Sequence, residues 1–297
     1  MAAVLATHEF FHARVTNPHT RRAYGRWISR FLHDLEVAGI ALRNLSPGVA
    51  GRWIEELPVG PMSKNQALTA LRHFADLLVT RHVVDANPFQ SVRRQRFTVV
   101  EGRTPEITVT QIQDLLRSID TSSVRGLRDR AVIGTLTYTG ARVGAVARLR
   151  LRDLQDSARG RVVRLHEKFG KQREIPVRWN LGNWLDEYVG TAGLTDVPKT
   201  GPLFRSLDIR NRSRLSAAPF VPQRIRAMLK TRLKHAGLPI TIRPHSFRVF
   251  VVTDLLAQDV PLEDVQYLAG HSNPQTTQVY DRRRRAVTRD IVDRISA

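Results

Sequence analysis

Residues 268–282 read LAGHSNPQTTQVYDR, and this short stretch carries the most informative chemistry of the chain. A histidine follows a glycine at position 271, and a tyrosine stands nine residues later at position 280. Three more arginines follow Arg282, so the tyrosine has strongly basic neighbours. A single tyrosine beside several arginines is most often a partly buried aromatic residue next to a solvated basic surface. The stretch therefore indicates a function only in combination with residues that precede it in the chain.

Three upstream segments carry cations of the kind that bind a phosphate group. Residues 137–142, TYTGAR, place Arg142 directly after a glycine-containing turn. His245 and Arg248 stand three residues apart, on one face of a predicted helix. Lys168 lies in a turn between two short predicted strands. Each signal is weak alone, because surface arginines usually pair with carboxylates and loop lysines are usually solvated.

Cleavage of a phosphodiester needs a nucleophile, cationic donors for the phosphoryl oxygens and a proton source for the leaving oxygen. Cations of the protein can take the place of a metal ion in this chemistry. The sequence has no DxD or HExxH string and no cluster of carboxylates for a pair of magnesium ions, which disfavours a two-metal nuclease. It also lacks a G-x-x-x-x-G-K-[ST] string. We therefore expect a reaction without metal, nucleotide or other cofactor.

The charge of the chain indicates a polyanionic partner. Its 297 residues include 47 Lys and Arg against 27 Asp and Glu, a formal net charge of +20, far beyond what solubility requires. No apolar run approaches about 18 residues and the N-terminus has no signal-peptide pattern, so nucleic acid is favoured over a membrane surface. The absence of cysteine excludes disulfides, thiolate zinc sites and a cysteine nucleophile. We expect an intracellular protein.

The apolar periodicity predicts an all-α domain over residues 1–90. Three segments repeat apolar residues at spacings of three and four, as amphipathic helices do. They are residues 20–39, 46–57 and 63–78. The stretch 91–105, SVRRQRFTVVEGRTP, contains four arginines and has no sustained period. It is the predicted linker.

A second domain is predicted over residues 106–297. Thr108 is placed to cap a helix, and the apolar stretch 127–136 predicts a buried helix. Residues 161–165 and 173–177 alternate as two short strands of a β-hairpin. Helical patterns dominate the remainder of this domain.

Taken in this order, the segments closely resemble the tyrosine recombinases, the family of phage integrases and chromosome-dimer-resolving recombinases. The matching strings are TGAR, KFGKQREIP, LAGHS and VYDR, and the N-terminal SKNQALTALRHF and ANP resemble the family's core-binding domain. The resemblance covers nearly the whole chain. It implies a mainly α catalytic domain with a small β-sheet (α+β), preceded by an all-α helical-bundle core-binding domain. Together these would form a C-shaped clamp on DNA.

The resemblance implies six catalytic residues: Arg142, Lys168, His245, Arg248, His271 and Tyr280. Tyr280 would attack the scissile phosphate, leaving a 3′-phosphotyrosine and a free 5′-hydroxyl. The two arginines would hold the non-bridging oxygens, and Lys168 would be the general acid, with Lys171 as its less favoured substitute. The two histidines would bond the phosphate, and the division of base duty between them stays open. The family often has a carboxylate three residues after the first arginine, where this chain has Ala145.

The implied activity is site-specific DNA recombination through a Holliday junction, in integration, excision or resolution. The implied partners are double-stranded DNA with inverted-repeat core sites, three further copies of the chain in a tetramer on DNA, and accessory DNA-bending proteins. The protein alone would be a monomer, located in a bacterial cytoplasm at the nucleoid. Basic segments outside the active site suggest further DNA contacts. These are Arg21, Arg22, Lys64, Arg72, Arg93, Arg94 and Arg96.

Two alternatives share parts of this pattern. A type IB topoisomerase uses the same chemistry as a monomer, but the short chain and the helical N-terminal domain favour the recombinase. A DNA-binding regulator without catalysis would have no need to keep all six residues. After Tyr280, an apolar stripe predicts a last helix that packs either on its own domain or on a neighbouring subunit. Its members are Val287, Ile291, Val292 and Ile295.

Overall fold

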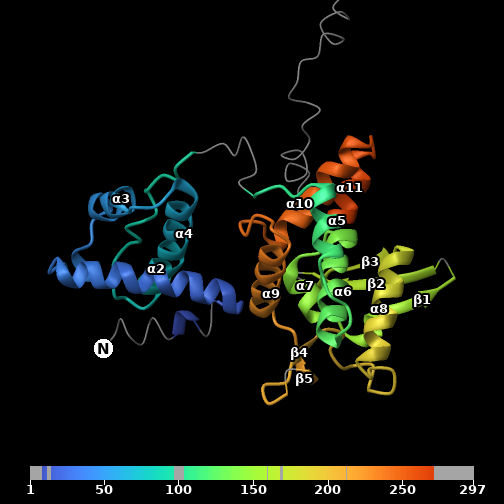
Figure 1. The fold of residues 1–297 in the computed structure, drawn as a ribbon. Coiled ribbons are helices and arrows are strands. Elements are labelled where there is room, and N and C mark those ends of the chain that lie inside the picture. Colours follow the sequence, from blue (N-terminus) through green and yellow to red (C-terminus); the bar gives the residue numbers. More distant parts are fainter. Residues whose placement is uncertain are drawn as a thin grey trace, which may run out of the picture. The chain divides into compact units, whose positions relative to one another are not determined.

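The computed structural model describes residues 9–11, 15–96, 104–158, 160–167, 170–211 and 213–270. The chain divides into two compact units, Met1–Thr98 and Val99–Ala297 (Figure 1). The division falls within the segment that the sequence predicts as a linker. None of the helices in the described ranges is suited to crossing a membrane.

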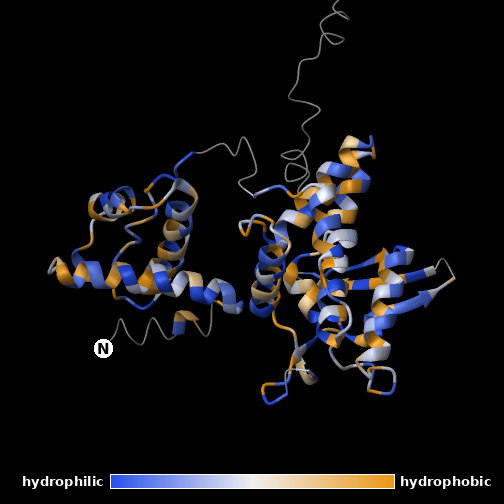
Figure 2. Cartoon of the chain, in the orientation of Figure 1, coloured by the Kyte–Doolittle hydropathy of each residue, from blue (hydrophilic) through white to orange (hydrophobic). Residues whose placement is uncertain are grey.

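The first unit is helical, as the apolar periodicity predicts. Its described helices are α2 (Pro18–Val37), the short 3-10 helix η2 (Leu42–Asn44), α3 (Pro47–Glu56) and α4 (Pro61–Thr80). Each α-helix has a proline in its first turn, where the missing N–H has no helical partner to lose. Buried residues of α2, such as Ile28 and Phe31, share one core with Leu71 and Phe74 of α4. The ribbon of α2 alternates hydrophilic and hydrophobic residues accordingly in Figure 2.

The first residues of the predicted linker are hydrogen-bonded to side chains of α4. The side chain of Asn65 donates to the carbonyl of Gln95 at 2.9 Å and accepts from its N–H at 2.9 Å. Arg72 donates through Nε to the carbonyl of Phe89 at 2.9 Å and through Nη2 to that of Val92. Residues 91–96 therefore belong structurally to the first unit, and residues 97–103 lie outside the described ranges.

The second unit is built around a central buried helix. The described α-helices are α5 (Val109–Arg117), α6 (Val124–Thr139), α7 (Val143–Arg148), α8 (Trp179–Thr191), α9 (Pro222–His235), α10 (Pro244–Ala257) and α11 (Leu262–Ala269), with the 3-10 helix η3 (Leu151–Asp153). Helix α6 contacts α5, α7, α8, α9 and α10, which explains why its apolar residues follow no single face. The predicted buried helix and the Thr108 cap of α5 are both confirmed.

Two small antiparallel sheets complete the second unit. The larger one has the order β1-β2-β3 and contains β1 (Leu154–Ser157), β2 (Gly160–His166) and β3 (Gln172–Pro176). The strands β4 (Arg205–Leu207) and β5 (Leu215–Pro219) pair separately. The predicted hairpin is confirmed, and the pairing of His166 with Gln172 places Glu167, Gly170 and Lys171 at its closed end. Strands β1, β4 and β5 were not predicted from the sequence.

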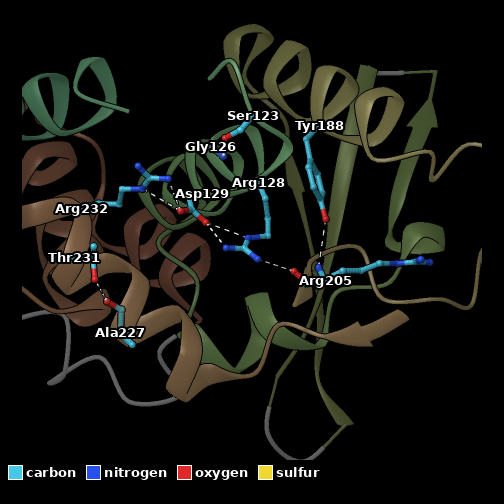
Figure 3. Close-up of polar contacts among 9 residues, drawn as sticks. All are labelled: Ser123, Gly126, Arg128, Asp129, Tyr188, Arg205, Ala227, Thr231 and Arg232. Atoms are coloured by element: carbon cyan, nitrogen blue, oxygen red, sulfur yellow. Dashed lines mark hydrogen bonds and ion pairs between the residues drawn. The ribbon is translucent and has the colours of Figure 1, made fainter. Parts of the chain in front are cut away.

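A buried ionic cluster joins α6, α9 and β4 (Figure 3). Asp129 is fully buried and lies between two guanidinium groups. Its Oδ1 accepts from Nη2 of Arg128 at 2.7 Å, and its Oδ2 accepts from Nη2 of Arg232 at 2.7 Å. Arg128 also donates to the carbonyl of Arg205 at 3.0 Å and stacks on the ring of Phe220, with Cζ 3.9 Å from the centroid. One carboxylate thereby bonds two guanidinium groups from different helices.

Candidate active site

The TGAR string forms a tight turn between α6 and α7. Helix α6 ends at Gly140, which has a φ of 57° and a ψ of 20°, a left-handed conformation that glycine adopts without strain. Arg142 then takes the N-cap position of α7, and its side chain is 43% exposed. The turn therefore presents Arg142 as an accessible cation at the start of a helix.

The second arginine of the site packs against this turn. Arg248 lies in the first part of α10, is only 2% exposed, and donates from Nη1 to the carbonyl of Gly140 at 3.0 Å. The bond joins residues 108 positions apart in the chain. It brings the arginine of H-x-x-R and the arginine of TGAR to one place, as the sequence analysis expected.

His245 opens α10 beside the two arginines. Its pKa is lowered from the ordinary value, first by partial burial and then by the positive charges of Arg248 and Arg142. A lowered pKa favours the neutral imidazole, which can accept a proton or a hydrogen bond through one ring nitrogen. The structure thus places three of the six predicted catalytic residues together.

The end of the β2–β3 hairpin reaches the same place. Glu167, the residue before Lys168, accepts from Nη1 of Arg142 and, at 2.7 Å, from Nη2 of Arg173. Its backbone N–H donates to the carbonyl of Lys171 at 2.8 Å, which closes the turn. Lys168 itself lies outside the described residues, but the residue before it touches Arg142.

The last turn of α11 is held to this hairpin by Arg173. Nη1 of Arg173 donates to the carbonyl of Leu268 and, at 3.4 Å, to that of Tyr267. Gly270 ends the helix with a φ of 62°. A Cβ on Gly270 would lie 2.6 Å from Nε of Arg173, so the close approach also requires glycine. His271, Tyr280 and the predicted C-terminal helix lie outside the described residues, but the helix end that precedes them adjoins the site.

Comparison with known proteins identifies the family. The model of the phage integrase family matches residues 105–286, more than half of the chain. The chain belongs to the phage integrase family. It is 30% identical over 238 residues to the tyrosine recombinase XerD of Xanthomonas campestris pv. campestris, an alignment that spans 77% of this chain and 70% of the relative.

Solved structures show the same fold. A XerH site-specific recombinase bound to palindromic difH substrate matches with a TM-score of 0.74 and 16% identity, over 95% of this chain and 82% of that one. A lambda integrase tetramer bound to a Holliday junction matches with a TM-score of 0.69 and 16% identity, over 98% and 80%. The mainly α fold with small sheets is confirmed. The protein is a tyrosine-type site-specific recombinase, which is favoured over both the topoisomerase and the silent regulator.

The recombinase departs from the family pattern at Ala145, which is 2% exposed and packs in the core. No carboxylate therefore reaches Arg142 from this position of α7. Neither Glu167 nor Arg173 was assigned a role from the sequence, although Arg173 is the arginine of the KFGKQREIP string. Burial opposes ionisation of Glu167, but its hydrogen bond with Arg173 and the charges of Arg142, Arg173 and Arg248 outweigh burial and lower its pKa.

The predicted DNA contacts of the first unit divide into two groups. Arg22, Arg93, Arg94 and Arg96 are exposed, and Arg94 also donates to Oγ1 of Thr69 at 3.2 Å. The other three side chains bond to backbone carbonyls of their own unit. Arg21 donates to Val15 at 3.0 Å, Lys64 donates to Glu55, and Arg72 donates to Phe89 and Val92. Both Nε and Nη2 of Arg72 hold the segment after α4, and its contact with DNA stays a prediction.

Proposed function

We propose that the recombinase cleaves and rejoins DNA through a 3′-phosphotyrosine on Tyr280, with Arg142 and Arg248 holding the scissile phosphate. The observation that carries this proposal is the hydrogen bond from Nη1 of Arg248 to the carbonyl of Gly140, at 3.0 Å. It joins two arginines that are distant in sequence into one cationic site. Each guanidinium can donate two parallel hydrogen bonds to phosphoryl oxygens, which a lysine cannot do.

The proposed reaction exchanges one phosphoester for another. The phenolic oxygen of Tyr280 forms a bond to phosphorus while the bond from phosphorus to the 5′ oxygen breaks. Lys168 gives a proton to that 5′ oxygen, and the reverse steps rejoin a new strand. Because the phosphotyrosine keeps the energy of the broken ester, no ATP is needed.

The cations of the site would compensate for a weak nucleophile. A tyrosine has a reference pKa of roughly 10, so few phenolates exist at neutral pH. Each donor aimed at the charge that develops on the phosphoryl oxygens is worth on the order of 3 kcal/mol. The lowered pKa of His245 keeps its ring neutral and able to accept the tyrosine proton. In this proposal His271 donates to a phosphoryl oxygen.

We propose double-stranded DNA with inverted-repeat core sites as the substrate, and a tetramer of this chain as the assembly that exchanges strands. The net charge of +20 supports a polyanionic partner. A tetramer is the assembly of the structurally similar lambda integrase on a Holliday junction. In this proposal the enzyme is monomeric without DNA, and DNA-bending proteins assist it at a bacterial nucleoid.

The test measures covalent attachment of the protein to a DNA core site that carries a nick. Cleavage next to the nick releases a short fragment that diffuses away, so the strand cannot be rejoined and the protein–DNA adduct accumulates. The wild type is expected to form a protein–DNA adduct in the presence of EDTA. Tyr280→Phe should form none while its affinity for DNA changes little. Tyr267→Phe is the matched control, because this side chain is 71% exposed on α11, and it should react normally. An adduct with Tyr280→Phe, or a requirement for metal, contradicts the proposal.

A further inference from the structure

A buried carboxylate connects two arginines at the closed end of the hairpin. Oε2 of Glu167 accepts from Nη1 of Arg142, and Oε1 accepts from Nη2 of Arg173 at 2.7 Å. The side chains of Glu167 and Arg173 are each only 7% exposed. Glu167 directly precedes Lys168 in the chain. A single residue therefore links the first arginine of the site to the hairpin that carries the lysine.

The same bridge continues to the helix that precedes His271. Arg173 donates to the carbonyls of Tyr267 and Leu268, the latter near the end of α11. Its Nε lies so near Gly270 that a Cβ there would approach to 2.6 Å. Arg142, Glu167, Arg173 and the end of α11 thus form one continuous set of contacts. The contacts join the N-cap of α7, the hairpin and the residues that lead into the LAGHS histidine.

Helix α7 offers no anion of its own to Arg142. Ala145 lies one turn further along, where its N–H donates to the carbonyl of Arg142 at 2.8 Å and its side chain is buried among apolar residues. We propose that Glu167 is a positioning residue that supplies this missing carboxylate from the hairpin and, with Arg173, fixes Arg142, the described end of the hairpin and the end of α11 relative to one another. The inference rests on the proposed roles of Arg142 and Lys168.

The charges and exposures explain how such a bridge would act. Arg142 is 43% exposed, and a long exposed side chain samples many rotamers unless a partner holds it. Glu167 is suited to hold it, because Arg173 anchors the carboxylate from the other side. A guanidinium has five N–H donors, so the bond from Nη1 to Glu167 leaves donors for a phosphate. The pKa of Glu167 is lowered despite its burial, so the carboxylate stays ionised at neutral pH.

The experiment separates positioning from folding by using Glu167→Gln, which keeps the size of the side chain and removes its charge. The adduct-forming rate at saturating nicked DNA is expected to fall by about 10- to 100-fold, by analogy with the loss of carboxylates that orient metal-ligating side chains. The affinity for DNA should change by less than about twofold, because the phosphate contacts of the rest of the protein remain. A carboxylate needed only to neutralise Arg173 would lower the melting temperature without changing this rate.

Two further variants complete the test. Glu174→Gln removes the same charge from the same hairpin, but Glu174 is 53% exposed and pairs with Arg164, so its rate should equal that of the wild type. Glu167→Asp keeps the charge and should fold even if the Gln variant does not, with a smaller loss of rate. A wild-type rate for Glu167→Gln, or equal losses from Asp and Gln, overturns the positioning role. Absence of any adduct with the wild type instead overturns the proposed function.

Discussion

Replacing Asp129 by asparagine should destabilise the second unit more than any loss of a surface charge. The fully buried carboxylate receives Nε and Nη2 of Arg128 at 3.0 and 2.7 Å, and the same two atoms of Arg232 at 3.0 and 2.7 Å. An asparagine has no charge for either guanidinium, and its NH2 group would face a donor. The side chain of Arg128 is 3% exposed, so water cannot replace the lost partner.

Removal of one member of a buried ion pair costs about 3–5 kcal/mol. In a unit of this size each kcal/mol lowers the melting temperature by roughly 2–4 °C, so the expected decrease is on the order of 10 °C. Differential scanning calorimetry of Asp129→Asn measures it. Asp156→Asn is the control, because Asp156 is 79% exposed and its pair with Arg161 should contribute little. If both variants melt within about 2 °C of the wild type, the cluster does not stabilise the unit as argued.

Three other predictions concern Gly270, His245 and the predicted DNA contacts of the first unit. Gly270→Ala should cost about 1–2 kcal/mol in denaturant unfolding from its left-handed backbone alone, and unchanged unfolding would contradict this. By displacing Arg173 it should also slow adduct formation, and a wild-type rate would contradict the close approach. Because folding lowers the pKa of His245, its contribution to stability is complete above about pH 6.5 and is lost as the pH falls. The melting temperature of His245→Gln should therefore decrease less than that of the wild type on acidification, and an equal decrease would refute this. Arg96→Ala should reduce the salt dependence of DNA binding by about one unit of slope, whereas Arg72→Gln should lower the melting temperature and leave that slope unchanged.

Local signals were sufficient for much of the fold. The helices with clear apolar spacing and a capping residue were predicted, because such signals act within a few residues of the chain. The hairpin was predicted because its two strands are adjacent in sequence. Strands β1, β4 and β5 were missed, since segments such as Leu154–Ser157 are short and alternate poorly. Their pairing depends on neighbours that the local sequence does not reveal.

Long-range partners account for the remaining differences. Asp129 meets Arg232 across 103 positions, and Arg248 meets Gly140 across 108. Arg72 has the sequence context of a surface cation, but its guanidinium is used by backbone carbonyls. A basic residue in a helix can bind DNA or donate to backbone carbonyls of its own chain. Only the three-dimensional placement of those carbonyls distinguishes the two roles.

Ala145 shows that the carboxylate partner of an active-site arginine can come from a different position in the sequence. The interaction between a carboxylate and Arg142 depends on the distance between their charged atoms, not on which element carries the carboxylate. In this recombinase the hairpin brings Glu167 to Arg142. The arginine therefore has a carboxylate partner although residue 145 is an alanine. A second carboxylate at Arg142 would repel Glu167 and add its own desolvation cost, while Arg173 is already bonded to Glu167. Relatives with an acidic residue at the position of Glu167 should therefore tend to have a small apolar residue at the position of Ala145. Relatives with a carboxylate at the position of Ala145 should lack an acidic residue at the position of Glu167. An alignment in which the two positions vary independently would refute this exchange.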